Sequence, residues 1–234
     1  MFGIIKEKDA IGYAYNKLIS INTLKDQSIS SKIKVDRKKV KICVVDDEGF
    51  DIEKVHSLGY IQVERKLGFE NISDYEKYNI ILCDIEGVGS EIDSVRQGLA
   101  VAEQIKSVYP EKIVLIYSGK NVESYGELPT EIDGILAKME SAANLVKKLD
   151  EYYKESIDPI VVWEKTRIQM LHAGIATKTI AIVEDKYCNS ILEREDYLKF
   201  EDYDYAEGYE MIEKYVKVLK NVLKILWGMK NDLQ

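Results

Sequence analysis

The sequence predicts an α/β fold in which helices cover both faces of a five-stranded parallel sheet, followed by a helical C-terminal module. Two observations predict the sheet: short, almost continuous apolar runs recur between residues 41 and 137, and helical stretches separate them. Strands that are apolar throughout are typical of parallel sheets, because both faces of such a sheet are buried. A third observation predicts the module, since the apolar residues after residue 158 recur at helical spacing.

The strands and helices of the predicted sheet domain alternate along the chain. The five predicted strands are residues 42–45, 60–64, 80–83, 113–117 and 134–137. The helices predicted between and after them are residues 51–58, 72–78, 94–108 and 141–153. The helix over 94–108 has the clearest pattern, because Val95, Leu99 and Ile105 share one face and Pro110 lies just beyond its end. This alternation of strand and helix is typical of one doubly wound domain.

The segments on either side of the sheet domain differ from it in composition. Residues 2–20 predict an amphipathic helix, and the polar, serine-containing residues 24–36 predict a linker. Asp158 and Pro159 predict a helix start, with Asp158 as the N-cap. The acidic, tyrosine-rich residues 193–207 predict a loop, and residues 209–229 a strongly amphipathic helix. The predicted organisation is therefore an N-terminal helix and linker (1–39), a sheet domain (40–153) and a helical module (154–234).

Composition excludes several classes of protein. The 234 residues include 46% apolar and 32% charged residues, which argues against wholesale disorder. No apolar run approaches the roughly 20 residues that span a bilayer, and charges stand early in MFGIIKEKDA where a signal peptide needs apolar residues. Three cysteines make no disulfide framework, so we expect a cytoplasmic protein without membrane contact. The net charge of −8 disfavours nucleic acid as a partner.

Polar side chains follow four of the predicted strands. Asp46 and Asp47 follow the first strand, Asp84 the third, Ser118 the fourth and Lys138 the fifth. Because the carboxyl ends of parallel strands meet at one edge of a sheet, we expect these side chains to converge. Three carboxylates suit a hard cation such as Mg²⁺, which prefers oxygen ligands. A hydroxyl and a lysine beside them can hold a phosphoryl group.

Residues 40–153 resemble the receiver domain of bacterial two-component response regulators. The resemblance lies in the motifs VKICVVDDE, IILCDIEGVG, QGLAVAEQIK, VLIYSGK and DGILAKM. It implies a flavodoxin-like sheet with strand order 2-1-3-4-5. It also implies that Asp84 is the phosphorylated residue, and that Mg²⁺ is bound by Asp46, Asp47, Asp84 and the backbone carbonyl of Glu86. Ser118 would be the switch hydroxyl, and Lys138 would pair with the phosphoryl oxygens.

The function implied by this resemblance is phosphorylation-controlled signalling. A histidine kinase or a small phosphodonor would supply the phosphoryl group, and the change would alter protein–protein contacts of the helical module. We therefore expect a phosphoryl acceptor with at most slow autodephosphorylation, not an enzyme. A protein effector is the expected partner, and the C-terminal helices could form a homodimer.

Departures from the family pattern keep two alternatives open. Ile135 stands where the family usually has Phe or Tyr, Met139 stands where it usually has Pro, and the stretch between Asp47 and Asp84 is short. These departures favour a non-switching interaction or adaptor protein, such as those of bacterial conflict and antiviral systems. A Mg²⁺-dependent phosphohydrolase is the third alternative, because Glu86 follows Asp84 by two residues, as a second acid does in that chemistry. The Asp46–Asp47 pair fits a receiver domain better.

Overall fold

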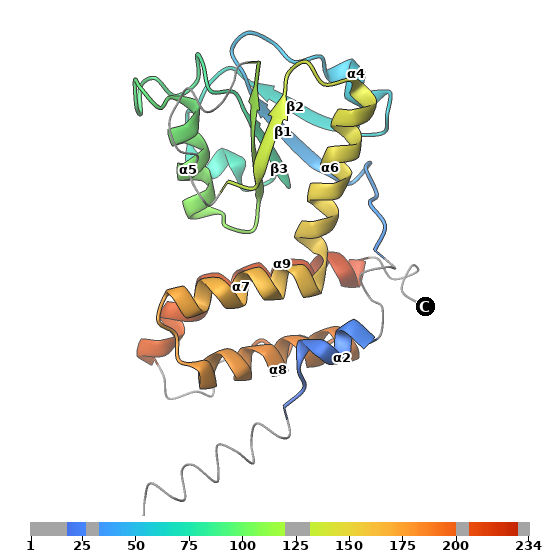
Figure 1. Ribbon diagram of the computed structural model, residues 1–234, viewed down its shortest axis with the longest axis vertical. Coiled ribbons are helices and arrows are strands. Elements are labelled where there is room, and N and C mark those ends of the chain that lie inside the picture. The colour runs from blue at the N-terminus through green and yellow to red at the C-terminus, as the bar shows by residue number, and fades with distance from the viewer. Residues whose placement is uncertain (1–17, 27–32, 120–131, 200–205, 229–234) are drawn as a thin grey trace, which may run out of the picture. The chain divides into compact units, whose positions relative to one another are not determined.

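A computed structural model describes residues 18–26, 33–119, 132–199 and 206–228 (Figure 1). The chain divides into two compact units: a sheet unit over Lys34–Ser156, and a helical unit that combines Met1–Ile33 with Ile157–Gln234. The helix predicted over 2–20 lies almost entirely outside the described residues, as do any elements between 121 and 131. Among the helices of the described residues, none is both long enough and apolar enough to cross a membrane.

The sheet unit contains one five-stranded parallel sheet. Its strands are β1 (Lys41–Val45), β2 (Gln62–Lys66), β3 (Ile80–Cys83), β4 (Ile113–Ser118) and β5 (Gly134–Ala137). Their order is β2-β1-β3-β4-β5, and all neighbouring strands run parallel. This topology confirms the predicted doubly wound, flavodoxin-like fold with strand order 2-1-3-4-5.

The interior of this unit follows from the apolar runs. Every residue of β3 and β4 is buried, as near-continuous apolar strands in a parallel sheet require. The helical elements are α4 (Ile52–His56), the 3₁₀ turn η1 (Ile72–Tyr75), α5 (Gly98–Val108) and α6 (Ala142–Ile157). Buried side chains of η1 and α5, among them Tyr75, Leu99 and Ile105, pack with those of β3 and β4 in one core. Cys43 and Cys83 belong to the same core as free, buried residues.

Several predicted element boundaries differ from the structure, and named contacts explain two of them. The helix predicted from residue 94 begins only at Gly98, because Asp93 Oδ1 accepts hydrogen bonds from the backbone N–H groups of Val95 and Arg96, and Gln97 has a φ of +45°. Val95, predicted on the buried face, is consequently 79% exposed. The second strand begins at Gln62 instead of Tyr60. Tyr60 is fully buried and donates its hydroxyl hydrogen bond to Asp150 on α6.

The helical unit contains α2 (Ile21–Asp26), α7 (Pro159–His172), α8 (Thr177–Glu193) and α9 (Ala206–Gly228). α2 packs against α7 and α8, and α9 packs against the same two helices. The buried Trp163 of α7 stacks on Tyr187 of α8, with ring centroids 6.1 Å apart. The prediction of a linker over 24–36 is wrong at its start, because Leu24 is fully buried in the last turn of α2.

Asp158 is the N-cap of α7, as predicted. Its Oδ1 atom accepts hydrogen bonds from Ile160 N at 2.9 Å and Val161 N at 3.3 Å. We expect Asp158→Ala to lower the free energy of unfolding of the helical unit by about 1 kcal/mol, because both N–H groups lose their partner. Asp158→Asn should retain most of the stability, because asparagine caps equally well. Urea unfolding followed by tryptophan fluorescence measures both, and equal losses in the two variants would contradict a capping role.

Candidate metal and phosphoryl-acceptor site

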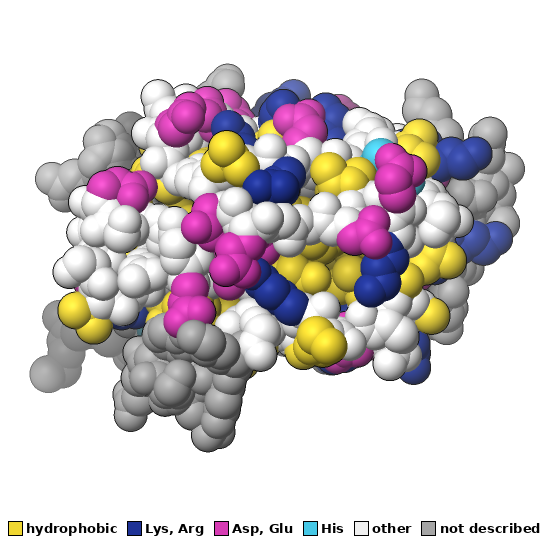
Figure 2. Space-filling view, turned by 90° about the horizontal axis from the view of Figure 1, so that it is seen from above, with side chains coloured by type: hydrophobic (Ala, Val, Ile, Leu, Met, Phe, Trp, Pro, Cys, Tyr) yellow, Lys and Arg dark blue, Asp and Glu magenta, His cyan; other side chains and the backbone are white. Residues whose placement is uncertain are grey.

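Three carboxylates meet where β1 and β3 end. Asp46, Asp47 and Asp84 each offer an oxygen atom, and these atoms lie within 4.8 Å of one another. The sheet register causes this, because Val45 pairs with Cys83 and Asp84 N donates a hydrogen bond to Val45 O at 2.9 Å. The side chains differ in exposure: Asp46 is fully buried, Asp84 is 4% exposed and Asp47 is exposed. Figure 2 shows acidic and basic side chains side by side on this face of the molecule, with hydrophobic side chains between them.

Asp46 uses its two oxygens differently. Oδ1 accepts hydrogen bonds from Glu48 N at 2.9 Å and Gly49 N at 2.8 Å, which fold the chain into the turn before α4. Oδ2 is buried and accepts no hydrogen bond, although Lys138 Nζ lies 2.8 Å away as an ion-pair partner. Burying a carboxylate oxygen without a hydrogen bond raises the free energy of the folded state unless a cation or a hydrogen-bond donor contacts that oxygen.

Lys138 brings a positive charge to this cluster from the end of β5. Its backbone N–H donates to Ser118 O at 2.9 Å, which continues the β4–β5 pairing. Its Nζ donates a hydrogen bond to Asp84 Oδ2. Burial lowers the pKa of the Lys138 ammonium, but its close polar contacts and charge interactions with Asp46 and Asp84 outweigh burial and raise the pKa above the ordinary value. The lysine is therefore charged at neutral pH.

Asp84 is held by the chain on both sides. Its Oδ1 accepts a hydrogen bond from Ile85 N at 2.8 Å. Burial raises the pKa of the Asp84 carboxyl, while the bond and charge of Lys138 act in the opposite direction. The backbone of Asp84 touches the start of α5, where a Cβ on Gly98 would lie 1.7 Å from the Asp84 carbonyl oxygen. Only glycine allows this approach of helix and strand end.

The loop after Asp84 carries a second close approach. Gly87 has a φ of +75°, and a Cβ there would lie 2.2 Å from Asp47 Oδ2. Gly87 N donates to Gln97 Oε1 at 3.1 Å, which anchors the peptide group that contains the Glu86 carbonyl. Glu86 itself is exposed. The loop therefore runs beside the Asp47 carboxylate, and the Glu86–Gly87 peptide borders the site.

The structure brings together most of the site residues predicted from the sequence. Asp46, Asp47, Asp84 and Lys138 form one cluster. Ser118 ends β4 and is 6% exposed, next to Lys138 in the sheet through its own backbone carbonyl. The donor set fits Mg²⁺, because it combines three carboxylates with one buried oxygen that accepts no hydrogen bond.

Two further residues contact the site and are missed by the sequence analysis. Arg65 donates to the backbone carbonyl oxygens of Asp46 at 2.9 Å and Asp47 at 3.1 Å. Tyr117 lies beneath Lys138 Nζ, 5.8 Å from its ring centroid, and makes an edge contact with Phe50 at 5.4 Å. Arg65 falls outside the strand predicted over 60–64, so the sequence pattern did not place it at this edge of the sheet. Tyr117 belongs to the apolar run predicted as the strand over 113–117, and the pattern does not distinguish it from the other residues of that run.

Comparisons with known proteins give matches among solved structures. No protein-family model matches the chain, and no curated protein matches it. Solved structures do match over about half of the chain. A CheY-like response regulator receiver domain protein from Methanospirillum hungatei JF-1 is 21% identical, with 50% of this chain and 95% of that chain covered and a TM-score of 0.42.

Two other solved structures match to a similar degree. A response regulator receiver protein from Sinorhizobium medicae WSM419 is 16% identical, covers 51% of this chain and 98% of its own, and has a TM-score of 0.39. The BeF3-activated receiver domain of DrrB, from Thermotoga maritima, is 23% identical, covers 48% and 96%, and has a TM-score of 0.38. Over about half of its length, the chain is thus similar in structure to receiver domains of response regulators.

Proposed function

We propose that this protein is a phosphorylation-controlled signalling protein in which Asp84 accepts a phosphoryl group. One observation carries the proposal: the Asp84 carboxylate accepts a hydrogen bond from Lys138 and lies beside the carboxylates of Asp46 and Asp47. Asp84 is 4% exposed, at the end of β3. A nucleophilic carboxylate beside a fixed cation is the arrangement that phosphoryl transfer to aspartate needs.

Phosphoryl transfer to Asp84 is a substitution at phosphorus. A carboxylate oxygen of Asp84 forms a bond to phosphorus, and the bond between phosphorus and the donor breaks. The donor is a phosphohistidine of a kinase or a small acyl phosphate. Its leaving group, the histidine imidazole or the carboxylate, departs with the electron pair of the broken bond. The product on Asp84 is an acyl phosphate. The Lys138 ammonium offsets negative charge on the phosphoryl oxygens, and the Ser118 hydroxyl donates a hydrogen bond to one of them.

Asp46, Asp47 and Asp84, with the backbone carbonyl of Glu86, would hold a Mg²⁺ ion in this site. The ion supplies charge neutralisation between the carboxylates and the phosphoryl oxygens. Asp46 contributes the buried Oδ2, which accepts no hydrogen bond. Asp47 contributes the exposed carboxylate at the rim of the cluster.

The output of the protein is, in this proposal, a change in protein–protein contacts of the helical unit. The sheet unit passes into the helical unit near the end of α6, where Ile157 begins the second part of the helical unit. Added charge at Asp84 biases the positions of Ser118 and Lys138, which belong to neighbouring strand ends. The protein is then a phosphoryl acceptor whose turnover is limited to slow autodephosphorylation.

Acetyl phosphate with Mg²⁺ tests the proposal. We expect intact-mass spectrometry to show a gain of one phosphoryl group in the wild-type chain, and hydroxylamine to remove it, because acyl phosphates are cleaved by this nucleophile and serine phosphates are not. Asp84→Asn should show no gain, because the acceptor oxygen nucleophile is lost. An equal, hydroxylamine-sensitive gain in Asp84→Asn, or no gain in the wild type with either acetyl phosphate or a kinase, would remove Asp84 from this role.

Glu86→Gln separates signalling from the phosphohydrolase alternative. The substitution keeps the backbone carbonyl at residue 86 and removes only the acid two residues after Asp84. We expect this variant to accept the phosphoryl group as the wild type does. Steady release of phosphate from a phosphomonoester by the wild type, lost in Glu86→Gln, would instead favour a phosphohydrolase.

The non-switching alternative keeps a specific observation in its favour. Ile135 is 39% exposed on β5, and Met139 is 90% exposed directly after Lys138. An aromatic ring is thus missing at the β5 position where the family pattern has one. Beryllofluoride with Mg²⁺ distinguishes the two proposals: a change in oligomeric state or partner binding supports switching, and an unchanged protein with bound beryllofluoride supports the adaptor.

A further inference from the structure

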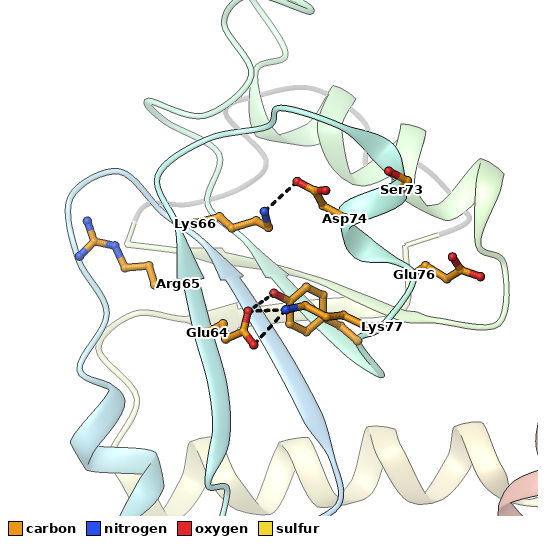
Figure 3. A pocket seen from close by; sticks show the side chains of 8 residues that line it. Glu64, Arg65, Lys66, Ser73, Asp74, Glu76 and Lys77 are labelled. Atoms are coloured by element: carbon orange, nitrogen blue, oxygen red, sulfur yellow. Dashed lines mark hydrogen bonds and ion pairs between the residues drawn. The ribbon is translucent and has the colours of Figure 1, made fainter.

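The arginine on β2 lies on the opposite side of that strand from its neighbours. Successive side chains of a strand point to opposite faces, and Figure 3 shows Glu64 and Lys66 directed toward η1 while Arg65 extends toward the loop that leads into α4. On the η1 side the charges pair with one another: Lys66 with Asp74 at 2.9 Å, and Lys77 with Glu64 at 2.7 Å. Arg65 does not join these ion pairs on the η1 side of β2. It contacts the loop that contains Asp46 and Asp47 instead.

Arg65 contacts two successive peptide groups with one guanidinium. Nε donates to Asp46 O at 2.9 Å, and Nη2 donates to Asp47 O at 3.1 Å. These carbonyls belong to the peptide planes before and after the Cα atom of Asp47. Because a residue's only soft backbone dihedrals are the rotations of those two planes about its Cα, holding both planes fixes the direction of the Asp47 Cα–Cβ bond. A planar fork of donors is suited to this, and a single ammonium is not.

Asp47 depends on its backbone more than the other two carboxylates do. The Asp46 side chain is fixed by bonds from Glu48 N and Gly49 N, and Asp84 by bonds from Ile85 N and Lys138. Within the described part of the chain, the Asp47 carboxylate is exposed and accepts no hydrogen bond. We propose that Arg65 is a positioning residue that aims the Asp47 carboxylate into the metal site through the backbone. This inference rests on the proposed Mg²⁺ site.

Removing Arg65 should change metal affinity in one direction if only its charge matters, and in the opposite direction if it positions Asp47. A guanidinium near a cation site repels the incoming ion, so removing it should strengthen Mg²⁺ binding if charge alone matters. If Arg65 holds Asp47, removing it should weaken binding, because a ligand must be ordered when the ion binds. Groups that orient metal ligands contribute roughly 10- to 100-fold in affinity. The two roles therefore differ in the sign of the change.

Mn²⁺ binding by the full chain, measured from the free-ion paramagnetic resonance signal and by competition with Mg²⁺, tests the inference. We expect Arg65→Ala to weaken binding of both ions roughly 10-fold or more. Arg65→Lys should bind almost as weakly, although it keeps the charge, because an ammonium does not span both carbonyls. Lys77→Ala is the matched control. It removes one positive charge beside β2, but Lys77 pairs with Glu64 and does not contact the loop. The Lys77→Ala variant should therefore bind both ions with the affinity of the wild type.

A second background shows whether Arg65 acts through Asp47. In Asp47→Asn the affinity falls, and adding Arg65→Ala should cause no comparable further loss, since the carboxylate that Arg65 orients is already replaced by a neutral amide. Unchanged or tighter binding by Arg65→Ala in a wild-type background would overturn the inference and leave the metal site standing. Further weakening in the Asp47→Asn background, equal to that in the wild type, would also overturn it. Wild-type protein that binds neither ion would overturn the metal site and the inference with it. Circular dichroism spectra of each variant establish that the compared chains are folded.

Discussion

Replacing Lys138 with methionine is expected to lower the free energy of unfolding of the sheet unit by about 3 kcal/mol when no divalent cation is present. Lys138 Nζ serves two buried carboxylates, through a hydrogen bond to Asp84 Oδ2 and an ion pair with Asp46 Oδ2 at 2.8 Å. Removing the ammonium leaves two buried carboxylates that face each other without a counter-charge, and breaking a buried ion pair costs 3–5 kcal/mol. The value of about 3 kcal/mol takes the low end of that range, because the lysine side chain is 20% exposed.

Mg²⁺ should recover much of this loss, since a cation held by the same carboxylates replaces the missing charge and stabilises the folded state by mass action. Wild-type protein should gain less from Mg²⁺, because Lys138 already neutralises part of the cluster. Asp46→Asn in the Lys138→Met background should also relieve the loss, so the double variant is more stable than the sum of the single changes predicts.

Urea unfolding in EDTA and in Mg²⁺, followed by circular dichroism, measures these differences. Tryptophan emission gives a separate signal, because both tryptophans, Trp163 and Trp227, belong to the helical unit. Lys147→Met is the control: its pair with Glu151 lies on the surface of α6, with side chains 76% and 60% exposed, so the change should cost less than about 1 kcal/mol. If Lys138→Met and Lys147→Met are equally stable in EDTA, Lys138 does not compensate buried charge.

The sheet and the acidic cluster could be predicted because both depend on local features of the chain. β3 and β5 occupy the residues predicted for them, 80–83 and 134–137, since an apolar run that ends in a polar residue marks a strand and its end. The carboxyl ends of parallel strands meet at one edge, so placing the strands already predicted that Asp46, Asp84 and Lys138 converge, and the register then sets how closely they approach.

Features that depend on pairing between distant segments, or on the conformation of single residues at a helix start, could not be predicted. Arg65 reaches the carbonyls of Asp46 and Asp47 only because β2 extends to Lys66 beside β1, and the apolar pattern alone placed the strand end at Glu64. The start of α5 depends on the left-handed backbone of Gln97 and on the Asp93 side chain, which a helical periodicity does not contain. Leu24 reads as part of a polar segment, and its burial follows from contacts of α2 with α7 and α8, far along the chain.

Gly98→Ala is expected to destabilise the sheet unit by about 3 kcal/mol, although helix propensity alone favours alanine at a helical position by about 1 kcal/mol. An added Cβ would lie 1.7 Å from the carbonyl oxygen of Asp84 and 2.9 Å from Ile85 Cα. Both contacts are with backbone, so no change of rotamer relieves them, and α5 must move away from the end of β3. That movement separates Leu99 and Ile105 from the core that they share with Ile81 and Cys83.

The movement of α5 away from β3 also displaces Asp84. Gly98→Ala should therefore reduce phosphoryl uptake from acetyl phosphate, even among the molecules that remain folded. Gly228→Ala is the matched control, because Gly228 is the last residue of α9 and a Cβ there meets nothing within 4 Å. Propensity then acts alone, and we expect Gly228→Ala to leave stability unchanged or raise it by up to about 1 kcal/mol. Urea unfolding should therefore show a loss of stability for Gly98→Ala and no loss for Gly228→Ala. If Gly98→Ala is as stable as Gly228→Ala, the helix and the Asp84 carbonyl do not approach as closely as described, and the close packing that holds the acceptor residue must be reconsidered.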